Sequence, residues 1–344
     1  MSRPIAARTS LRPAATGAVV AALAVVYVVW GSTYYAIREA IDTMPPLLMA
    51  GTRFLVAGTL LFAVASRRGD RGGDPIRAVH WRSALILGVA LLGIGNGGVT
   101  IGEQYVPTGI VALLVATVPL WMALCAHVVG IERVRPITAA GIGVGLAGVA
   151  LLLRPGAGGG ASAVAMLAVL VSPLCWAAGS VYSRVAPLPR RPLVTTGMEM
   201  LCGGAACTVA GIAHGELGQV HLSAISLRST LALAYLVVFG SILAFSAYIW
   251  LLGHASTSLV STYAYANPVI AVLLGWWLLG ERITGQTLLA AAVIVVAVAL
   301  IVSGPRLRSA RALALDAERE TTGLPQPWTE VTTVAAAGRA CRGS

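Results

Sequence analysis

The chain has 344 residues, of which 57% are hydrophobic and only 11% are charged, whereas soluble domains carry about 25% charged residues. All 24 basic residues are arginine, and the absence of lysine excludes a P-loop ATPase and any enzyme or retinal pump that forms a Schiff base. Although the formal net charge is +11, the arginines lie between apolar runs and not on one soluble face, so we expect no nucleic acid partner.

Apolar runs near 20 residues long, the length that crosses a bilayer core, follow one another along the chain. The sequence therefore predicts an all-α integral membrane protein with ten transmembrane helices. The predicted spans are residues 17–37, 46–65, 83–102, 107–129, 137–153, 161–182, 193–213, 230–252, 257–279 and 284–303. The first span resembles a signal peptide, but it is too long and has no suitable cleavage site, so we expect an uncleaved helix.

The arginines predict the orientation of these spans. With the N-terminus inside, nineteen arginines fall in cytoplasmic segments. The opposite side holds only Arg38, Arg154, Arg228 and Arg282. Because cytoplasmic loops collect basic residues, both termini are predicted to be cytoplasmic, with residues 1–16 as a short leading segment and residues 304–344 as a mostly disordered tail.

The two halves of the chain resemble each other at a constant offset of 149 residues. The matched positions are Pro119 with Pro268 and Glu132-Arg133 with Glu281-Arg282. The sequence thus predicts two five-helix repeats, residues 17–153 and 161–303. Since five is odd, the second repeat enters the membrane from the opposite side. Such inverted repeats are the architecture of carriers that work by alternating access.

Three segments carry a more specific resemblance. They are WGSTYYAIREAIDTMPPLLMAGTRFLVAG, GNGGVTIGEQYVPTGIVALLVATVP and STYAYANPVIAVLLGWWLLGE. They are similar to the EamA family of the drug/metabolite transporter superfamily, and within it to the YedA-type branch. The resemblance implies a ten-helix carrier of the bacterial inner (plasma) membrane, with a central cavity lined by the first four and the sixth to ninth helices. Characterised relatives mostly export amino acids, other metabolites or toxic compounds, and membership does not fix the substrate.

Two ionisable side chains inside predicted spans are candidates for a substrate site, since such groups usually face a cavity or a partner. Arg53 and Glu199 occupy corresponding positions in the two halves. In inverted repeats they would differ in depth by roughly 10 Å, so no firm ion pair is expected. Arg53 could anchor a substrate carboxylate, and Glu199 could bind an amino group or a coupling proton. In the alternative, each caps backbone groups or fixes helix packing.

The third span carries a polar stripe. Asn96, Thr100 and Glu103 share one face, because residues four and seven apart lie above one another on a helix. The stripe lines an aqueous path or, in the alternative, joins helices by hydrogen bonds. Glu103 stands near the predicted water interface, where it could simply be solvated.

Aromatic side chains also line one face of the first span, where Trp30 and Tyr34 stand with Tyr27. Such a stripe is more often packing than a ligand cage, but beside an intramembrane arginine it would suit an aromatic or bulky apolar substrate. The ninth span offers two stripes that point about 200° apart. They are Tyr263 with Asn267, and Ser261 with Tyr265, and the sequence does not choose between them.

Pro119 and Pro268 lie inside predicted helices, where proline removes a backbone hydrogen bond. Matched kinks are candidate hinges for alternating access, and static bends are the alternative. Gly141, Gly145 and Gly148 form a small-residue face in the fifth span, for which packing within the monomer is favoured over a dimer interface.

No catalytic or metal-binding pattern is found. The sequence lacks HExxH and GxSxG motifs and paired catalytic carboxylates, and His214 and His221 flank Glu216 at a spacing that is not a recognised metal site. We therefore expect no enzyme, no metal and no cofactor. The scattered cysteines are expected to be small core residues.

Together these features predict a secondary-active exporter of amino acids or related small metabolites, with a broad drug-efflux protein as the alternative. A membrane enzyme or lipid-handling protein would need a catalytic cluster at one interface, and a scaffold would leave Arg53 and Glu199 without purpose. The expected partners are a small-molecule substrate and the lipid bilayer, and the protein is expected to be a monomer or a homodimer.

Overall fold

The computed structural model describes residues 15–67, 75–130, 134, 136–154, 161–255, 257–260 and 262–301. Within these ranges every regular element is a helix and no strand occurs. The predicted tail at 304–344 and Glu132-Arg133 lie outside the described residues. The predicted all-α class is confirmed for the part of the chain that the structure describes.

Among the described residues, seven helical runs are long and apolar enough to cross a membrane. They are α1 (Thr16–Ala40), α2 (Pro46–Arg67), α3 (Ala78–Leu87) with η1 (Gly88–Asn96) and α4 (Gly97–Gly102), α5 (Thr108–Val115) with α6 (Val118–Val128), α8 (Ala163–Val169) with α9 (Val171–Ser183), α10 (Pro192–Ala213), and α11 (Leu227–Tyr235) with η4 (Leu236–Leu243) and the start of α12 (Ala244–His254).

Shorter elements complete the described fold. Three apolar helices are shorter, namely α7 (Pro136–Leu152), the Ala266–Leu279 part of α14 (Tyr263–Leu279), and Gly285–Ile301. The remaining elements are η2 (Glu216–Gln219), η3 (Leu222–Ala224) and α13 (Thr257–Val260). The predicted count of ten spans therefore stays a prediction.

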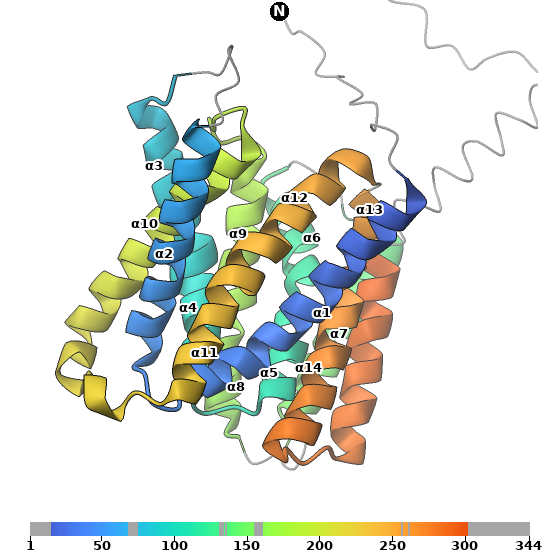
Figure 1. Cartoon of the computed structure of the whole chain (residues 1–344). Coiled ribbons are helices and arrows are strands. Elements are labelled where there is room, and N and C mark those ends of the chain that lie inside the picture. The colour runs from blue at the N-terminus through green and yellow to red at the C-terminus, as the bar shows by residue number, and fades with distance from the viewer. Residues whose placement is uncertain are drawn as a thin grey trace, which may run out of the picture. The chain divides into compact units, whose positions relative to one another are not determined.

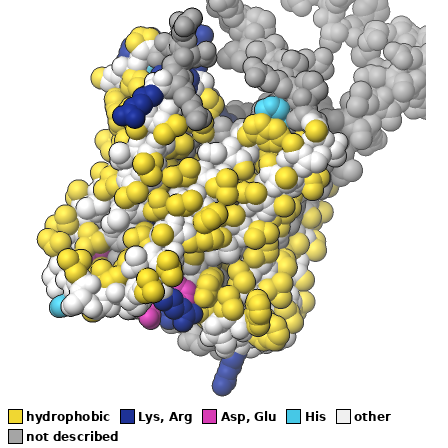
Figure 2. Space-filling view, viewed as in Figure 1, with side chains coloured by type: hydrophobic (Ala, Val, Ile, Leu, Met, Phe, Trp, Pro, Cys, Tyr) yellow, Lys and Arg dark blue, Asp and Glu magenta, His cyan; other side chains and the backbone are white. Residues whose placement is uncertain are grey.

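The helices lie side by side in one bundle, with α1 and α12 crossing obliquely in front of the others (Figure 1). α1 packs on α14, α12 and α11, and α2 packs along α10. On the face seen in Figure 2, hydrophobic side chains cover the middle of the bundle and most charged side chains gather towards its ends. Exposed large residues such as Leu60, Trp277 and Leu288 are what a lipid-facing surface requires, because lipid solvates apolar side chains.

Two of the membrane-length runs contain a π-helix. These are η1, which starts at Gly88, and η4, which starts at Leu236, 148 residues later. A π-helix widens the helical turn and leaves backbone groups less regularly paired, and it is frequent at functional sites. Asn96 ends η1 and Ser241 lies inside η4, so both polar residues stand in irregular backbone.

The two matched prolines have different local effects. Before Pro119 the helix ends at Val115 and restarts at Val118, whereas Pro268 lies within the continuous helix α14. Pro119 therefore breaks its helix, in place of the predicted bend, and the matched kinks are not equivalent. A hinge role for either proline stays a prediction.

Glycines set how closely the helices approach. A Cβ added at Gly51 of α2 would lie 2.3 Å from the Thr208 hydroxyl of α10, and one at Gly204 of α10 would lie 2.8 Å from the backbone nitrogen of Leu55. This close contact fixes α2, and with it Arg53, against α10. The glycines of α7 that were predicted to form a packing face contact the helix Gly285–Ile301 and Leu120 of α6, so that face packs within the chain.

Candidate functional site

The Arg53 side chain of α2 contacts a residue of each π-helix. Its side chain is 5% exposed. Its Nε donates a hydrogen bond of 2.9 Å to the Ser241 hydroxyl in η4, and its Nη1 makes a long contact of 3.5 Å with Oδ1 of Asn96 at the end of η1. A Cβ added at Gly240 would lie 3.3 Å from Nη2 of Arg53 and 3.1 Å from Thr33 of α1. The guanidinium is thus enclosed by α1, α2, η1 and η4.

No described carboxylate forms an ion pair with Arg53. Burial of an unpaired charge is expensive, and buried charges are normally paired. The 3.5 Å contact with Asn96 is at the limit of a hydrogen bond. The guanidinium also lies over the Phe54 ring, with Cζ 4.8 Å from the ring centroid, a contact that leaves the positive charge without a described counter-ion. A buried arginine fork that lacks a counter-ion is suited to a bound carboxylate.

An aromatic cluster lies next to the arginine. Trp30 of α1 has its ring centroid 5.6 Å from Phe245, 5.2 Å from Tyr248 and 5.2 Å from Tyr263. Its indole N–H donates to the carbonyl of Gly240 at 3.3 Å, the same residue that borders Arg53. The cluster therefore continues the arginine site towards α12 and α14. Its rings pack on one another, as the sequence favoured for Trp30.

Asn267 adds an unpaired polar group one helical turn after Tyr263. Its side chain is 8% exposed, and its Oδ1 has no hydrogen-bond partner among the described residues. Such orphaned acceptors are rare and need an explanation. Tyr263 faces Trp30, so the stripe of Tyr263 and Asn267 is turned towards α1. Of the other predicted stripe, Ser261 and the Tyr265 side chain lie outside the described parts of the chain.

The residues of the predicted polar stripe in the third span have different surroundings in the structure. Thr100 is fully buried and donates to the carbonyl of Asn96 at 2.9 Å, so its hydroxyl is satisfied within its own helix. Glu103 is also fully buried, and the suggestion that it is solvated is wrong. It accepts a 2.8 Å hydrogen bond from the Thr108 hydroxyl. Tyr34 packs against the large apolar core cluster.

Glu199 lies apart from Arg53. It is half-buried in α10, and its carbonyl lies against Gly88 of η1. No ion pair or side-chain hydrogen bond joins Glu199 to Arg53 or to any other described residue. The structure thus brings Arg53, Asn96, Trp30 and Tyr263 together and leaves Glu199 outside this group.

Two carboxylates that the sequence did not assign cap helices. Glu216 accepts hydrogen bonds from the backbone nitrogens of Leu47 and Leu48 at the start of α2, so it is a buried cap. Glu281 accepts from the backbone nitrogens of Thr108 at 2.6 Å and Gly109 at 3.1 Å at the start of α5. Carboxylates are stabilised at helix N-termini.

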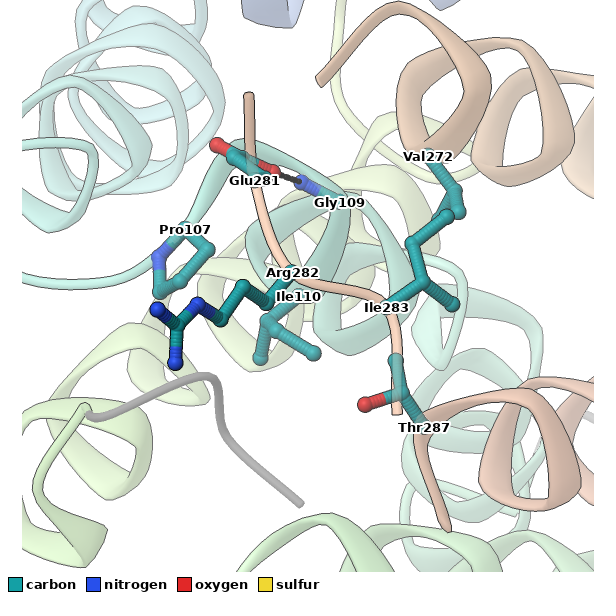
Figure 3. Close-up of a pocket in the computed structure, with 8 residues that line it drawn as sticks. All are labelled: Pro107, Gly109, Ile110, Val272, Glu281, Arg282, Ile283 and Thr287. Atoms are coloured by element: carbon teal, nitrogen blue, oxygen red, sulfur yellow. Dashed lines mark hydrogen bonds between the residues drawn. The ribbon is translucent and has the colours of Figure 1, made fainter. Parts of the chain in front are cut away.

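Figure 3 shows the Glu281 cap beside a small cavity of about 10 Å³ that Arg282 and Thr287 also line. A cavity of this size has room for about one water molecule. No group of three or more His, Cys, Asp or Glu residues able to hold a metal was found among the described residues.

Polar contacts join α1 to the second half on both sides of the residues that border Arg53 and the aromatic cluster, Trp30 and Thr33. Near the C-terminal end of α1, Glu39 forms an ion pair with Arg228 of α11, and its carbonyl accepts from the Ser229 hydroxyl at 2.7 Å. Near the middle of α1, one helical turn before Trp30, Tyr27 and Thr262 are hydrogen-bonded through their hydroxyls. We call these the Arg228 end and the Tyr27 end.

The EamA-like transporter family matches residues 16–154 and again residues 163–303. The chain belongs to this family. It is similar to the inner membrane transporter YedA of Escherichia coli strain K12, with 41% identity over 292 residues that cover 84% of this chain and 92% of YedA. The protein is therefore a multi-pass transporter of the inner membrane, as the motifs predicted.

More distant relatives agree with the transporter class. A protein of Escherichia coli strain K12 named a probable amino-acid metabolite efflux pump is 28% identical, covering 83% of this chain and 95% of that one. A solved crystal structure superposes with a TM-score of 0.56 at 23% identity, covering 83% of this chain and 96% of the other. At that identity the likeness supports the fold alone.

Proposed function

We propose that this EamA protein is a secondary-active exporter of amino acids or related small metabolites that works by alternating access. The observation that carries the substrate class is the buried Arg53, whose fork meets no carboxylate among the described residues. A substrate carboxylate would supply the missing charge. The efflux-pump name of one relative supports the same class.

The residues around Arg53 are suited to bind the amino group of an amino acid. Asn267 Oδ1 is a buried acceptor for which the described part of the chain supplies no donor, and an ammonium group has three N–H donors. The faces of Trp30 and Tyr263 can add a cation–π contribution. Arg53 and the aromatic cluster both border Gly240, so one small molecule could touch both.

The architecture proposed is ten spans in two inverted repeats, residues 17–153 and 161–303, with both termini cytoplasmic. Two matches to one family in the same chain support a repeat. The π-helices that start 148 residues apart also support it. The excess of arginines on one side supports the orientation. In this arrangement Arg53 lies between the halves, where inverted-repeat carriers bind substrate.

Alternating access then needs closable contacts on both sides of the site. The ion pair at the Arg228 end and the hydroxyl pair at the Tyr27 end are suitable, because each joins α1 to a helix of the second repeat. Opening one end would break these polar contacts and would also separate apolar side chains of α1 from their neighbours, such as Ile37 at the Arg228 end and Val26 at the Tyr27 end. Energy would come from an ion gradient or exchange, since a chain without lysine has no P-loop.

Broad efflux of cationic apolar compounds is the second candidate. The cluster of Trp30, Phe245, Tyr248 and Tyr263 offers several aromatic faces, and Glu199 is a half-buried carboxylate without an ion-pair partner among the described residues. Such a protein would depend on Glu199 and the aromatic rings and not on Arg53. Names of relatives as transporters point away from an enzyme in either case.

Counterflow in proteoliposomes tests the proposal without knowledge of the coupling ion. Vesicles are loaded with an unlabelled amino acid, and entry of the same labelled compound is followed, with the decarboxylated amine as a parallel substrate. We expect counterflow for at least one amino acid and none for its amine. Counterflow of amines and lipophilic cations alone would favour the second candidate and remove the role of Arg53.

A further inference from the structure

Glu103 is a second buried ionisable group that substrate binding does not use. It directly follows the span Ala78–Gly102 and has no exposed surface. Its Oε2 accepts a hydrogen bond from the Thr108 hydroxyl at 2.8 Å, whereas its Oε1 has no hydrogen-bond partner among the described residues. An ionised carboxylate has about four acceptor sites to satisfy. With one hydrogen bond, the neutral acid is the form that this environment suits.

A neighbouring carboxylate strengthens this conclusion. Thr108 donates its hydroxyl to Glu103 and its backbone nitrogen to Glu281, so the two carboxyl groups meet at one residue. Glu281 has two backbone N–H donors at the start of α5, a position that favours a negative charge. Two close carboxylates disfavour double ionisation. Of the two carboxyl groups, Glu103 has fewer hydrogen-bond donors and is therefore the one whose surroundings favour a bound proton.

The other ionisable groups around Glu103 come from α1. Arg38 donates to the backbone carbonyl of Glu103 and not to its carboxylate, and Tyr34 also faces it. The packed helix α8 contributes no ionisable side chain. Burial raises the pKa of the Glu103 carboxyl well above its ordinary value, against an opposing effect of the Thr108 hydrogen bond.

We propose that Glu103 is a proton-binding site of the transport cycle, which takes up a proton when the Arg228 end closes and releases it when that end opens. This inference rests on the proposed alternating access. The same end of α1 supplies Arg38 to the Glu103 carbonyl and Glu39 to the ion pair with Arg228. Separation of α1 from α5 and α11 would admit water to Glu103 and would free Arg38 to pair with its carboxylate.

The proposal predicts that the pH on one side of the membrane controls whether the Arg228 end is open or closed. Low pH on the side of the Arg228 end favours the closed form with neutral Glu103, and higher pH favours the open form with ionised Glu103. If the proposed topology is right, this is the external side. External acidification would then hold that end closed, and a neutral substitute at Glu103 would remove the effect.

Two measurements on the full-length protein in lipid nanodiscs test this without a substrate. The first is an infrared difference spectrum between wild type and Glu103→Gln at neutral pH, with Glu199→Gln as the matched control. Glutamine keeps the oxygen that accepts from Thr108, so the fold should be preserved. We expect a protonated-carboxyl band that Glu103→Gln loses and Glu199→Gln retains. If the spectrum of Glu103→Gln keeps every protonated-carboxyl band of the wild type, the proposal is overturned.

The second measurement is the distance between spin labels at Asp42 and Leu227, exposed positions on either side of the Glu39–Arg228 pair, over a range of pH. We expect long distances to become more populated as pH rises in wild type and to be independent of pH in Glu103→Gln. The same pH response in both proteins would also overturn the link to Glu103. If both results hold and counterflow finds no substrate, the transport function fails while the proton site stands.

Discussion

Replacement of Arg53 by lysine should weaken substrate binding while it keeps the buried positive charge. In the wild-type site the Nε of Arg53 is held by Ser241 at 2.9 Å, which leaves the two Nη groups for a carboxylate. A planar fork can donate two parallel hydrogen bonds, whereas an ammonium group acts as a point charge. The lysine variant can therefore contact the same carboxylate but with one strong hydrogen bond fewer.

The size of the effect follows from that one bond. A hydrogen bond to a charged group contributes about 1.5–3 kcal/mol. A loss of that size corresponds to a rise in Kd of roughly 10- to 150-fold at 25 °C. The decarboxylated amine makes no contact with the fork, so its affinity should change little.

Equilibrium binding of the amino acid found by counterflow is measured by calorimetry on purified wild type and Arg53→Lys. Arg67→Lys, an exposed position at the end of the same helix α2, is the matched control and should bind like wild type. Equal affinity of wild type and Arg53→Lys for the carboxylate would refute the assignment of Arg53 as the anchor.

Other changes have separate expected outcomes. Gly240→Ala should slow counterflow in folded protein, because the added Cβ would stand 3.1 Å from Thr33 and 3.3 Å from Arg53 Nη2 and would displace one of them. Gly143→Ala, with no atom within 4 Å of the added Cβ, should transport like wild type, and equal rates for the two variants would contradict the crowding argument. Glu281→Ala removes the cap of α5 and should cost about 1–2 kcal/mol, seen as a lower Tm in a thermal melt. Gly51→Ala places a Cβ 2.3 Å from an α10 hydroxyl and should cost about 1–3 kcal/mol, and an unchanged Tm would mean that α2 and α10 separate easily.

Much of the fold could be predicted because hydropathy responds directly to the bilayer. The sequence placed the long apolar helices within a few residues, and motifs such as the segment around Arg53 indicated the EamA family. The π-helices were not predicted. The sequences of η1 and η4 show the pattern of an ordinary apolar α-helix. Whether the turn widens to a π-helix depends on packing against neighbouring helices.

Some residues of the candidate site could be singled out from the sequence, and their assignment to a substrate site stays a prediction. Arg53 could be found because a charge inside an apolar run is conspicuous, and Asn267 because it interrupts one. The burial of Glu103 was missed, since its position directly after an apolar run suggested contact with water, whereas the structure leaves its side chain without exposed surface. Glu216 and Glu281 were missed as caps because each acts on a helix that is remote in sequence.

Alternating access is the central claim, and paired distance measurements test it most directly. One spin-label pair, Asp42 with Leu227, spans the Arg228 end, and a second, Val20 with Leu259, reports on the Tyr27 end from exposed positions on α1 and α13. With the substrate identified by counterflow present, we expect long distances at one end to gain population as those at the other end lose it. Two ends that open together, or that both ignore the substrate, would contradict a carrier that exposes Arg53 to one side at a time.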